Sequence, residues 1–509
     1  MTVIAGLDFG TSSVKLVVAF PDGRRVRAQA AYATRFGPAG EIEQDPEEWW
    51  RAAETVLADS GVADRIDAIG VTGQMQDLVP VSSAGALRPA MLYSDTRAEA
   101  AHRQLHAAVP DWELRTGNIQ DVTSVASKIR WMSEHEPDLL ASADTLLLGA
   151  PGYIAWRAGG RAVCDVLTAS TTGLLDVHAQ GWFEGVVQAT GARLDQMPEL
   201  VGSVSGDDRV GAVSARAAAE LGITPGVPIV MVTGDAGSTT DGLVGSSPGD
   251  AYLYLGTTGW VAGVSDEPAS GPSVFHSLVM PGWRRRLQIG AVQSAGAAAD
   301  WGRRTFFPGL DFDEVERLIE SRVDVVAHRP LCLPGLSGER TPVRDSAFRG
   351  AFVGVQEQTD SVDMYLGILT GVAMGLRHAA GEMGILQDRL PLVGGAASSP
   401  AWRRILANVC GSTVVTGEAE DPGCHAALRA VARAGDAGPV PAPLFSAAGA
   451  LTETRPTSAQ ADYAEQLSTH RELYAALAPT FHRLSAHEAP TVDHTTSVTE
   501  SAPHRKGQQ

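Results

Sequence analysis

The chain has 509 residues and a formal net charge of −19, with 40 Lys and Arg against 59 Asp and Glu. This length exceeds what one hydrophobic core usually serves, so we expect two large domains, and the 44% hydrophobic content can fill both cores. The acidic balance disfavours nonspecific binding to nucleic acid or to acidic membranes, and we expect neither as a partner.

The cysteines and the apolar runs indicate the compartment. The four cysteines are scattered without metal-ligand spacing, so they are predicted to be reduced thiols of the core: Cys164, Cys332, Cys410 and Cys424. Neither a signal peptide nor an apolar run long enough to span a membrane is evident. These features predict a cytoplasmic protein.

The first predicted element is a tight hairpin over residues 7–14. An apolar strand ends at Asp8 and Phe9, and the small residues Gly10, Thr11, Ser12 and Ser13 precede a second apolar run. Such a turn offers backbone N–H and hydroxyl groups to an anion. Asp8 can orient Mg²⁺ beside a phosphate, or it can simply cap the turn.

Further strands and a helix follow. Residues 14–20 and 24–33 predict strands joined by a Pro-Asp-Gly turn, and Pro46 with the acids after it predicts a helix start, with the helix running to Ala58. Residues 66–73 predict a buried strand that ends at a loop. This loop contains Gln74, Met75, Gln76 and Asp77, whose amides and carboxylate suit a polyhydroxyl ligand, although an ordinary polar turn explains them equally simply.

Asp235 follows the predicted strand at residues 228–233 and lies between Gly234 and Gly237. A carboxylate at a strand end can accept the proton of a substrate hydroxyl during phosphoryl transfer. Alternatively, Asp235 caps a helix that begins at Ala236. The two interpretations are compatible.

The second half of the chain repeats the opening hairpin at residues 253–260. Its turn contains Gly256, Thr257, Thr258 and Gly259, and Tyr254 stands where the first hairpin has Asp8. Two phosphate loops predict a nucleotide clamp between two domains, with any metal held on one side only.

Three later segments complete the pattern. Residues 361–383 predict a helix, and residues 337–342 a charged surface turn with a weak Glu339–Arg340 pair. After a strand ending near Val393, the residues Gly394, Gly395 and Ala396 permit the close approach of adenine or ribose, or form a helix-leading turn. Trp49, Trp50 and Trp402 are expected in the core, and the polar residues 487–509 predict a disordered tail.

Taken in order, these segments resemble the FGGY carbohydrate kinases, and most of all their xylulokinase branch. The resemblance spans about residues 3 to 480 and rests on the ordered set of residues 7–13, 73–75, 234–237, 255–259, 336–342 and 394–396. Residues 43–50 and 128–131 also look like family segments. The ordered set is far more specific than any single member.

The resemblance implies an α/β fold of two ribonuclease H-like, actin-like ATPase domains that close around ATP, Mg²⁺ and a sugar. We expect residues 1–245 to form the sugar-binding domain and residues 246–486 the nucleotide-binding domain. By the resemblance, Asp235 is the catalytic base and Asp8 supports Mg²⁺ and the transferring phosphoryl group. The remaining roles carried over are phosphate binding by Gly10–Ser13 and Gly256–Gly259, adenosine binding by Gly394–Ala396, and sugar binding by Gln74 and Met75.

Two segments depart from the xylulokinase pattern. The chain has Gln74-Met75-Gln76-Asp77 where these kinases typically have Gln-Met-His-Gly, and Tyr93-Ser94-Asp95-Thr96-Arg97 where they have Trp-Asn-Asp-Gly-Arg. Asp95 and Arg97 are retained, and together with Gln76 and Asp77 they are candidate sugar-binding residues. Both departures fall in the half expected to define sugar choice.

The resemblance therefore predicts ATP-dependent phosphorylation of a sugar hydroxyl, with D-xylulose converted to D-xylulose 5-phosphate. A related ketose, polyol or sugar acid, such as ribulose, glycerol or gluconate, is the alternative substrate. An actin-like ATPase that does not phosphorylate a small molecule is the alternative class. The family often forms dimers, so a homodimer is an open expectation.

Overall fold

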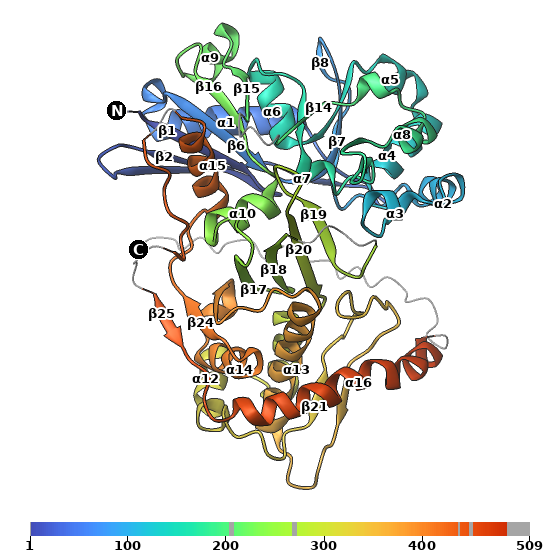
Figure 1. Cartoon of the computed structure of the whole chain (residues 1–509), viewed down its shortest axis with the longest axis vertical. Coiled ribbons are helices and arrows are strands. Elements are labelled where there is room, and N and C mark those ends of the chain that lie inside the picture. The colour runs from blue at the N-terminus through green and yellow to red at the C-terminus, as the bar shows by residue number, and fades with distance from the viewer. Residues whose placement is uncertain (1, 203–207, 267–271, 436–437, 447–450, 486–509) are drawn as a thin grey trace, which may run out of the picture.

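A computed structural model describes residues 2–202, 208–266, 272–435, 438–446 and 451–485 of the chain. Two lobes are stacked along the long axis of the molecule, each built around its own sheet, with helices α10 (Asp235–Leu243) and α15 (Pro422–Arg433) between them (Figure 1). The predicted tail, residues 487–509, lies outside the described residues.

The N-terminal lobe is built on a six-stranded sheet whose order is β15-β16-β6-β1-β2-β3. Strands β1, β2 and β3 form an antiparallel meander, whereas β6 and β16 run parallel to β1. The strands are β1 (Ile4–Phe9), β2 (Ser13–Ala19), β3 (Arg25–Ala31), β6 (Ala68–Gly73), β15 (Arg209–Ala212) and β16 (Pro228–Met231). The predicted hairpin and the strands that follow it are confirmed.

The C-terminal lobe repeats this arrangement in its own sheet, β19-β20-β18-β17-β23-β24-β25. Here β17, β18 and β20 form the antiparallel meander, and β23 and β24 continue parallel to β17. The strands are β17 (Ala251–Leu255), β18 (Gly259–Ser265), β19 (His276–Val279), β20 (Arg286–Val292), β23 (Arg389–Val393), β24 (Thr413–Thr416) and β25 (Thr452–Thr454). The order β20-β18-β17-β23-β24 therefore matches β3-β2-β1-β6-β16.

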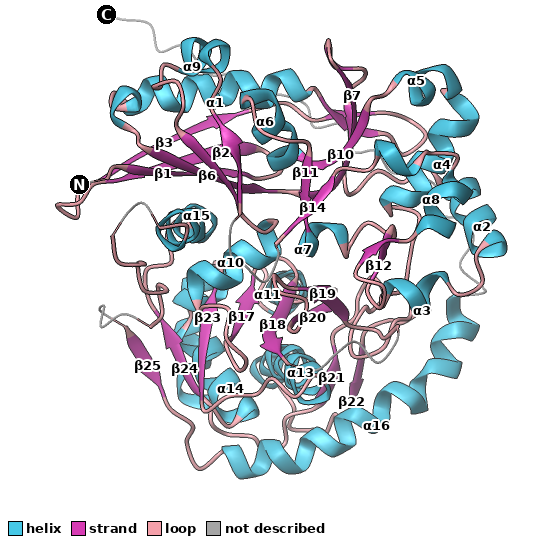
Figure 2. Ribbon diagram, turned by 45° about the horizontal axis from the view of Figure 1, so that its top comes forward, coloured by secondary structure: helices cyan, strands magenta, loops and turns pink. Residues whose placement is uncertain are grey.

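Helices cover the outer face of the first sheet, where α1, α6 and α9 lie above the strands (Figure 2). Helix α1 (Pro46–Ser60) begins at the predicted proline, and the Asp45 carboxylate caps it by accepting from the Glu47 N–H at 3.0 Å. Its Trp49 and Trp50 are buried, as predicted, since large apolar faces must leave water. The other helices here are α6 (Ala150–Ala158) and α9 (Ala215–Leu221).

A second sheet, β10-β7-β9-β5-β4, extends the N-terminal lobe and carries its own apolar cluster. Its strands are β4 (Arg35–Phe36), β5 (Ile42–Gln44), β7 (Met75–Ser82), β9 (Ala90–Met91) and β10 (Thr145–Gly149), with β8 (Gly85–Ala86) paired to β7. The helices around it are α2 (Glu99–Ala108), α3 (Trp112–Thr116), α4 (Val125–His135), α5 (Pro137–Ser142), α7 (Val166–Ala169) and α8 (Glu184–Thr190). Short pairs complete it: β11 (Val163–Asp165) with β14 (Glu199–Val201), and β12 (Leu175–Asp176) with β13 (Gly181–Trp182).

Helix α13 (Ser361–Glu382) forms the centre of the C-terminal lobe. It confirms the helix predicted for residues 361–383, and the Asp360 carboxylate caps it by accepting from the N–H groups of Val362 and Asp363. Around it lie α11 (Gly296–Phe306), α12 (Phe312–Ile319), α14 (Pro400–Cys410), α16 (Gln460–Ser485) and the hairpin of β21 (Leu331–Leu333) and β22 (Ala351–Val353). Trp402 on α14 is buried, as predicted.

Helix α15 links the lobes, because it lies between β24 and β25 of the second sheet in sequence but packs on β1 and β6 of the first. Small residues permit this approach: a Cβ on Gly6 would lie 2.4 Å from the Cys424 carbonyl oxygen. A buried ion pair at 2.9 Å joins Asp241 on α10 to Arg429 on α15. This packing holds the two sheets against a shared pair of helices.

The cysteine prediction is confirmed, since Cys164, Cys332, Cys410 and Cys424 are all buried and unpaired. Burial raises the pKa of each thiol, which keeps it protonated. Within the described ranges, no helix is long and apolar enough to cross a membrane.

Candidate active site

Three parallel strands of the first sheet end at one edge and deliver the candidate residues there. Asp8 on β1 is in register with Thr72 on β6, and the Thr72 hydroxyl donates to the Thr233 carbonyl just beyond β16 at 2.7 Å. Asp8 near the end of β1, Gln74 after β6 and Asp235 after β16 thus lie at the carboxyl ends of neighbouring strands. Open α/β sheets bind ligands at this edge.

The first hairpin turns through four residues, closed by a hydrogen bond from the Gly10 N–H to the Ser13 carbonyl at 3.0 Å. Burial raises the pKa of Asp8 to about 6. Gly423 lets helix α15 pack directly against this carboxylate, since a Cβ there would lie 2.3 Å from Asp8 Oδ2. An acid next to an open turn suits Mg²⁺, which takes one or two carboxylates together with phosphate oxygens.

The second hairpin has a three-residue turn in which the Gly256 N–H donates to the Thr258 carbonyl at 2.9 Å. Helix α11 begins on this turn, because the Gly296 and Ala297 N–H groups donate to the Gly256 and Thr257 carbonyls at 2.9 and 3.0 Å. Gly394, with φ of 93°, comes directly after β23, which pairs with β17. Its backbone packs so tightly on the end of β17 that a Cβ would lie 2.4 Å from the Leu255 carbonyl oxygen. The phosphate-loop and adenosine-loop candidates, including Gly395 and Ala396, therefore lie together.

A cavity of about 810 Å³ lies between the lobes. Thr11, Met75, Gln76 and Asp235 line it from the N-terminal lobe, and its opposite wall includes His276, Arg340 and Arg344. The Arg344 guanidinium and the Asp121 carboxylate pair across it at 3.8 Å. The cavity thus brings a candidate base, a phosphate loop and part of the sugar loop to one space.

Asp235 is the first residue of α10, and Gly234 takes the cap position. The N-cap interpretation of Asp235 is therefore wrong, and its Oδ1 instead accepts from the adjacent Ala236 N–H at 2.8 Å. Burial, followed by the negative charge of Asp8, raises the pKa of Asp235 to about 7. A carboxylate with this pKa is poised to exchange a proton near neutral pH.

The predicted loop at residues 74–77 is for the most part the start of strand β7. Gly73, with φ of 156°, lets the chain turn sharply, and the Gln74 N–H donates to the Phe9 carbonyl at 2.7 Å. Met75 and Gln76 reach the cavity, whereas Gln74 and Asp77 are buried beside it. Gln76 adopts φ of 64°, and its amide Nε2 donates to the Thr171 carbonyl at 2.9 Å.

The two departures from the xylulokinase pattern contact each other. Asp77 is fully buried, and its Oδ1 accepts from the Tyr93 N–H at 3.1 Å. Burial raises the pKa of Asp77, and burial lowers the pKa of the neighbouring Lys128, whose ammonium donates to the Gln76 and Leu92 carbonyls at 2.9 and 2.6 Å. The changed residues thus form one unit, in which Gln76, Tyr93, Ser94 and Thr96 line the cavity and Asp77 lies buried behind them.

Asp95 and Arg97 do not line the cavity. Arg97 Nη2 pairs with Asp95 Oδ2 at 2.7 Å and with Glu43 at 2.8 Å, and the other Asp95 oxygen accepts from Arg97 Nε at 3.0 Å. Asp95 is fully buried. The two residues therefore form an ion pair behind the wall, and their contact with a sugar stays a prediction.

Other residues of the wall escaped the sequence analysis. Asn118, Asp121, Thr171 and His276 line the cavity, mostly from irregular segments whose periodicity carries no signal. Glu339 contradicts its prediction as a surface residue: it is 5% exposed, and Oε1 accepts from the Gln293 and Arg340 N–H groups at 2.8 and 2.9 Å. Burial raises its pKa to about 7. Its backbone partners, rather than Arg340's guanidinium, hold it inside.

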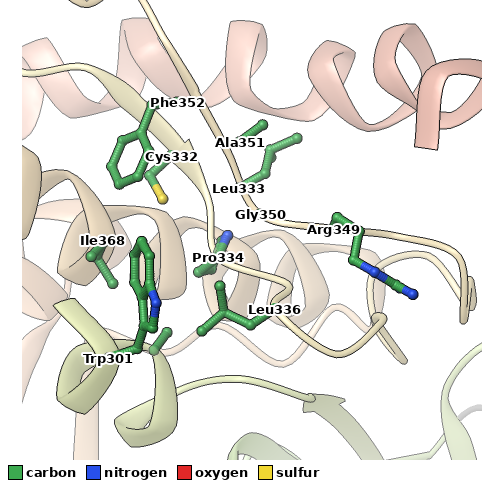
Figure 3. A pocket seen from close by; sticks show the side chains of 11 residues that line it. Trp301, Cys332, Leu333, Pro334, Leu336, Arg349, Gly350, Ala351, Phe352 and Ile368 are labelled. Carbon is green, nitrogen blue, oxygen red and sulfur yellow. The ribbon is translucent and has the colours of Figure 1, made fainter. Parts of the chain in front are cut away.

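A second cavity, of about 300 Å³, lies within the C-terminal lobe and is shown in Figure 3. Trp301, Leu336, Phe352 and Ile368 form its apolar walls, and Arg349 lies at one end. None of the candidate catalytic or phosphate-loop residues lines it. The chemistry of the molecule is therefore expected in the larger cavity.

Comparison with known proteins identifies the arrangement. Residues 3–242 match the N-terminal domain of the FGGY family of carbohydrate kinases, and residues 251–434 match its C-terminal domain. The chain belongs to this family. It is therefore a carbohydrate kinase, and its repeated sheets agree with the expected pair of ribonuclease H-like domains.

Individual relatives agree with this assignment. The chain is 32% identical to a xylulose kinase of Escherichia coli over 419 residues, which cover 80% of this chain and 84% of that protein. The crystal structure of a xyloylose kinase from Brucella ovis superposes with a TM-score of 0.82 at 27% identity, covering 95% of this chain and all of the other. A xylulose kinase from Rhodospirillum rubrum, at 24% identity and a TM-score of 0.83, covers 94% of this chain and 100% of its own and shares the fold.

Proposed function

We propose that this FGGY kinase transfers the γ-phosphoryl group of ATP to a hydroxyl of D-xylulose, giving D-xylulose 5-phosphate and ADP. The observation that carries the proposal is Asp235, a carboxylate with a raised pKa that lines the interlobe cavity together with Thr11 and Gln76. The relatives named xylulose kinases support the choice of sugar.

In the proposed mechanism, Asp235 accepts the proton of the sugar hydroxyl as its oxygen attacks the γ-phosphorus. The bond from the γ-phosphorus to the β,γ-bridging oxygen breaks, and ADP leaves with the electron pair. Backbone N–H groups of both hairpins stabilise the charge on the phosphoryl oxygens. Because the two hairpins lie on different lobes, closure of the lobes would complete the site and exclude water.

Asp8 is the proposed Mg²⁺ ligand, because it is the acid at the first phosphate loop. When bound, Mg²⁺ neutralises charge on the phosphate oxygens. Gly256, Thr257 and Thr258 would hold phosphates, and Gly394, Gly395 and Ala396 the adenosine. With these roles we also propose the division of the chain into a sugar-binding domain, residues 1–245, and a nucleotide-binding domain, residues 246–486.

Met75 and Gln76 are the proposed sugar contacts of β7. The Gln76 amide Nε2 donates one hydrogen to the Thr171 carbonyl, so its second N–H and its Oε1 are available to donate to and accept from sugar hydroxyls. Gln74, Asp77, Asp95 and Arg97 would act indirectly, by fixing the wall that carries these contacts. A hydroxyl-rich substrate suits this mixture of amide, thioether and carboxylate groups.

The test is ADP release measured with ATP, Mg²⁺ and a panel of acceptors: D-xylulose, D-ribulose, glycerol and gluconate. We expect D-xylulose to give the highest kcat/KM and a product with one phosphate ester on its terminal carbon. A higher kcat/KM with another acceptor would replace D-xylulose while keeping the kinase. ATP turnover that no acceptor stimulates would favour the actin-like ATPase instead.

A further inference from the structure

The buried side chain of Gln44, at the end of β5, lies between the first phosphate loop and the sugar loop. It is 0% exposed, and all of its hydrogen-bonding capacity is used. Its Nε2 donates to the Thr11 carbonyl at 2.6 Å and to the Thr34 hydroxyl at 2.8 Å. Its Oε1 accepts from Trp49 Nε1 at 2.7 Å and from Gln74 Nε2 at 3.0 Å. One planar amide thus joins four segments.

Two of these partners belong to the active site. Thr11 stands in the turn of the first hairpin and lines the interlobe cavity. Gln74 follows β6, and its main chain is already bonded to Phe9 at the end of β1. Two sets of hydrogen bonds therefore hold the phosphate loop and the sugar loop at a constant distance. One is made by the Gln74 main chain and the other by the Gln44 amide.

Only a neutral carboxamide satisfies this position. The Thr11 carbonyl requires a donor, while the Trp49 and Gln74 N–H groups require an acceptor. A carboxylate in its place would meet the Thr11 carbonyl with a lone pair, and an apolar side chain would leave the buried Trp49 and Gln74 N–H groups unpaired. The Gln74 Oε1 itself is buried without a hydrogen-bond partner among the described residues, so Gln74 depends on Gln44 for its orientation.

We propose that Gln44 is a positioning residue that couples the two substrates: it sets the phosphate loop and the sugar loop at the separation needed for phosphoryl transfer. The proposal rests on the function assigned above, because it takes the Thr11 loop to hold phosphate and the Gln74 segment to hold sugar. A small shift between two reacting groups lowers the rate of transfer strongly.

The experiment compares Gln44→Met and Gln44→Glu with a matched control, Gln196→Met. Gln196 is 1% exposed, and its amide is likewise bonded, to the Leu140 and Ala143 carbonyls at 2.8 and 2.9 Å and to the Arg193 N–H at 2.9 Å. It lies outside the interlobe cavity. The control therefore measures the loss of stability that follows from removing a buried, hydrogen-bonded glutamine anywhere in the protein.

The readouts are the melting temperature, the KM for each substrate at saturation with the other, and the ratio of ADP to sugar phosphate formed. Gln196→Met should lower the melting temperature and leave both KM values unchanged. Its ratio of ADP to sugar phosphate should stay at the wild-type value of about one. Gln44→Met should raise both KM values by about tenfold and raise the ratio, since water replaces a misplaced hydroxyl. Gln44→Glu, which keeps the acceptor, should raise the KM for ATP more than that for sugar.

A double variant tests the coupling directly. If Gln44 acts through Gln74, the double variant Gln44→Met, Gln74→Met should raise the KM for sugar no more than the more damaging of the two single variants does. Gln44 variants whose KM values and product ratio equal those of Gln196→Met would overturn the proposal. If wild type and Gln196→Met show no sugar-dependent turnover, the assigned function fails instead. The affinity for ADP then still tests the link between Gln44 and the phosphate loop. It should fall in Gln44→Met and stay at the wild-type value in Gln196→Met.

Discussion

The two lobes share one strand order but differ in the chemistry at the ends of their strands. In the first sheet, Asp8 lies near the end of β1 and Asp235 follows β16, whereas the second sheet has Tyr254 at the position of Asp8. The first turn has four residues between the paired strand ends and the second has three. The sheet order is thus common to both lobes, whereas the acid near the end of the first strand is present in the first lobe and replaced by Tyr254 in the second.

The two acids of the first lobe are buried. Burial raises the pKa of Asp8 to about 6, and burial, followed by the negative charge of Asp8, raises the pKa of Asp235 to about 7. Each carboxylate is therefore costly to ionise inside the fold. Tyr254 instead stacks on Trp260, with ring centroids 3.7 Å apart, and stabilises its hairpin by apolar contact.

The largest expected effect comes from removing the acid after β16. Asp235→Asn keeps the volume and the start of α10 but cannot accept the hydroxyl proton. We expect kcat to fall by about 10² to 10⁴-fold, the usual contribution of a general base. Coupled measurement of ADP release with the sugar at saturation checks this.

Nucleotide binding provides the control for that variant. The affinity for ADP, measured by calorimetry, should stay close to that of wild type, because both hairpins remain intact. Retention of more than half of the wild-type kcat would remove Asp235 from the proposed role.

The second effect compares equivalent positions of the two hairpins. Asp8→Asn should lower kcat on the order of 100-fold and raise the Mg²⁺ concentration needed for half-maximal activity, because a metal ligand is lost. Tyr254→Phe should change kcat by about twofold or less, since no charge is removed. Titrations of activity against Mg²⁺ for both variants decide; equal responses would contradict the one-sided metal site.

Local patterns in the sequence predicted the frame well. The Gly10 and Gly256 turns, the helix start at Pro46 and the helix at residues 361–382 follow from turn chemistry, capping and periodicity, which act over a few residues. The family resemblance extended these elements to the two-lobed fold. The elements that were predicted correctly are therefore those whose conformation is determined by neighbouring residues in the sequence.

What the sequence could not predict depends on contacts between distant segments. Glu339 is buried because the Gln293 N–H meets its carboxylate, and Asp95 turns inward because Arg97 and the Ile42 N–H bind it. Likewise, α15 lies on the first sheet through small residues such as Gly6. Each of these outcomes needs a partner from elsewhere in the chain, which no local pattern specifies.

The smallest effect concerns stability, and it compares Asp235 of the first lobe with Tyr254 of the second. The folded-state pKa of Asp235 is about 7, above its ordinary value of 3.8, so its contribution to stability is fully present below the ordinary value and is lost as the pH rises through 7. Asn has no proton to lose. Asp235→Asn should therefore raise the melting temperature at pH 8 on the order of several °C, with the gain shrinking toward pH 4.

Tyr254→Phe gives the comparison from the other lobe, because it removes a hydroxyl and no carboxylate. The change in melting temperature should therefore be the same at pH 8 and near pH 4. Melting curves of both variants and wild type over this range are the measurement. If Asp235→Asn melts at or below the wild-type temperature at pH 8, the buried charge of Asp235 is not a cost to the fold. The inequality of the two lobes would then have to rest on catalysis alone.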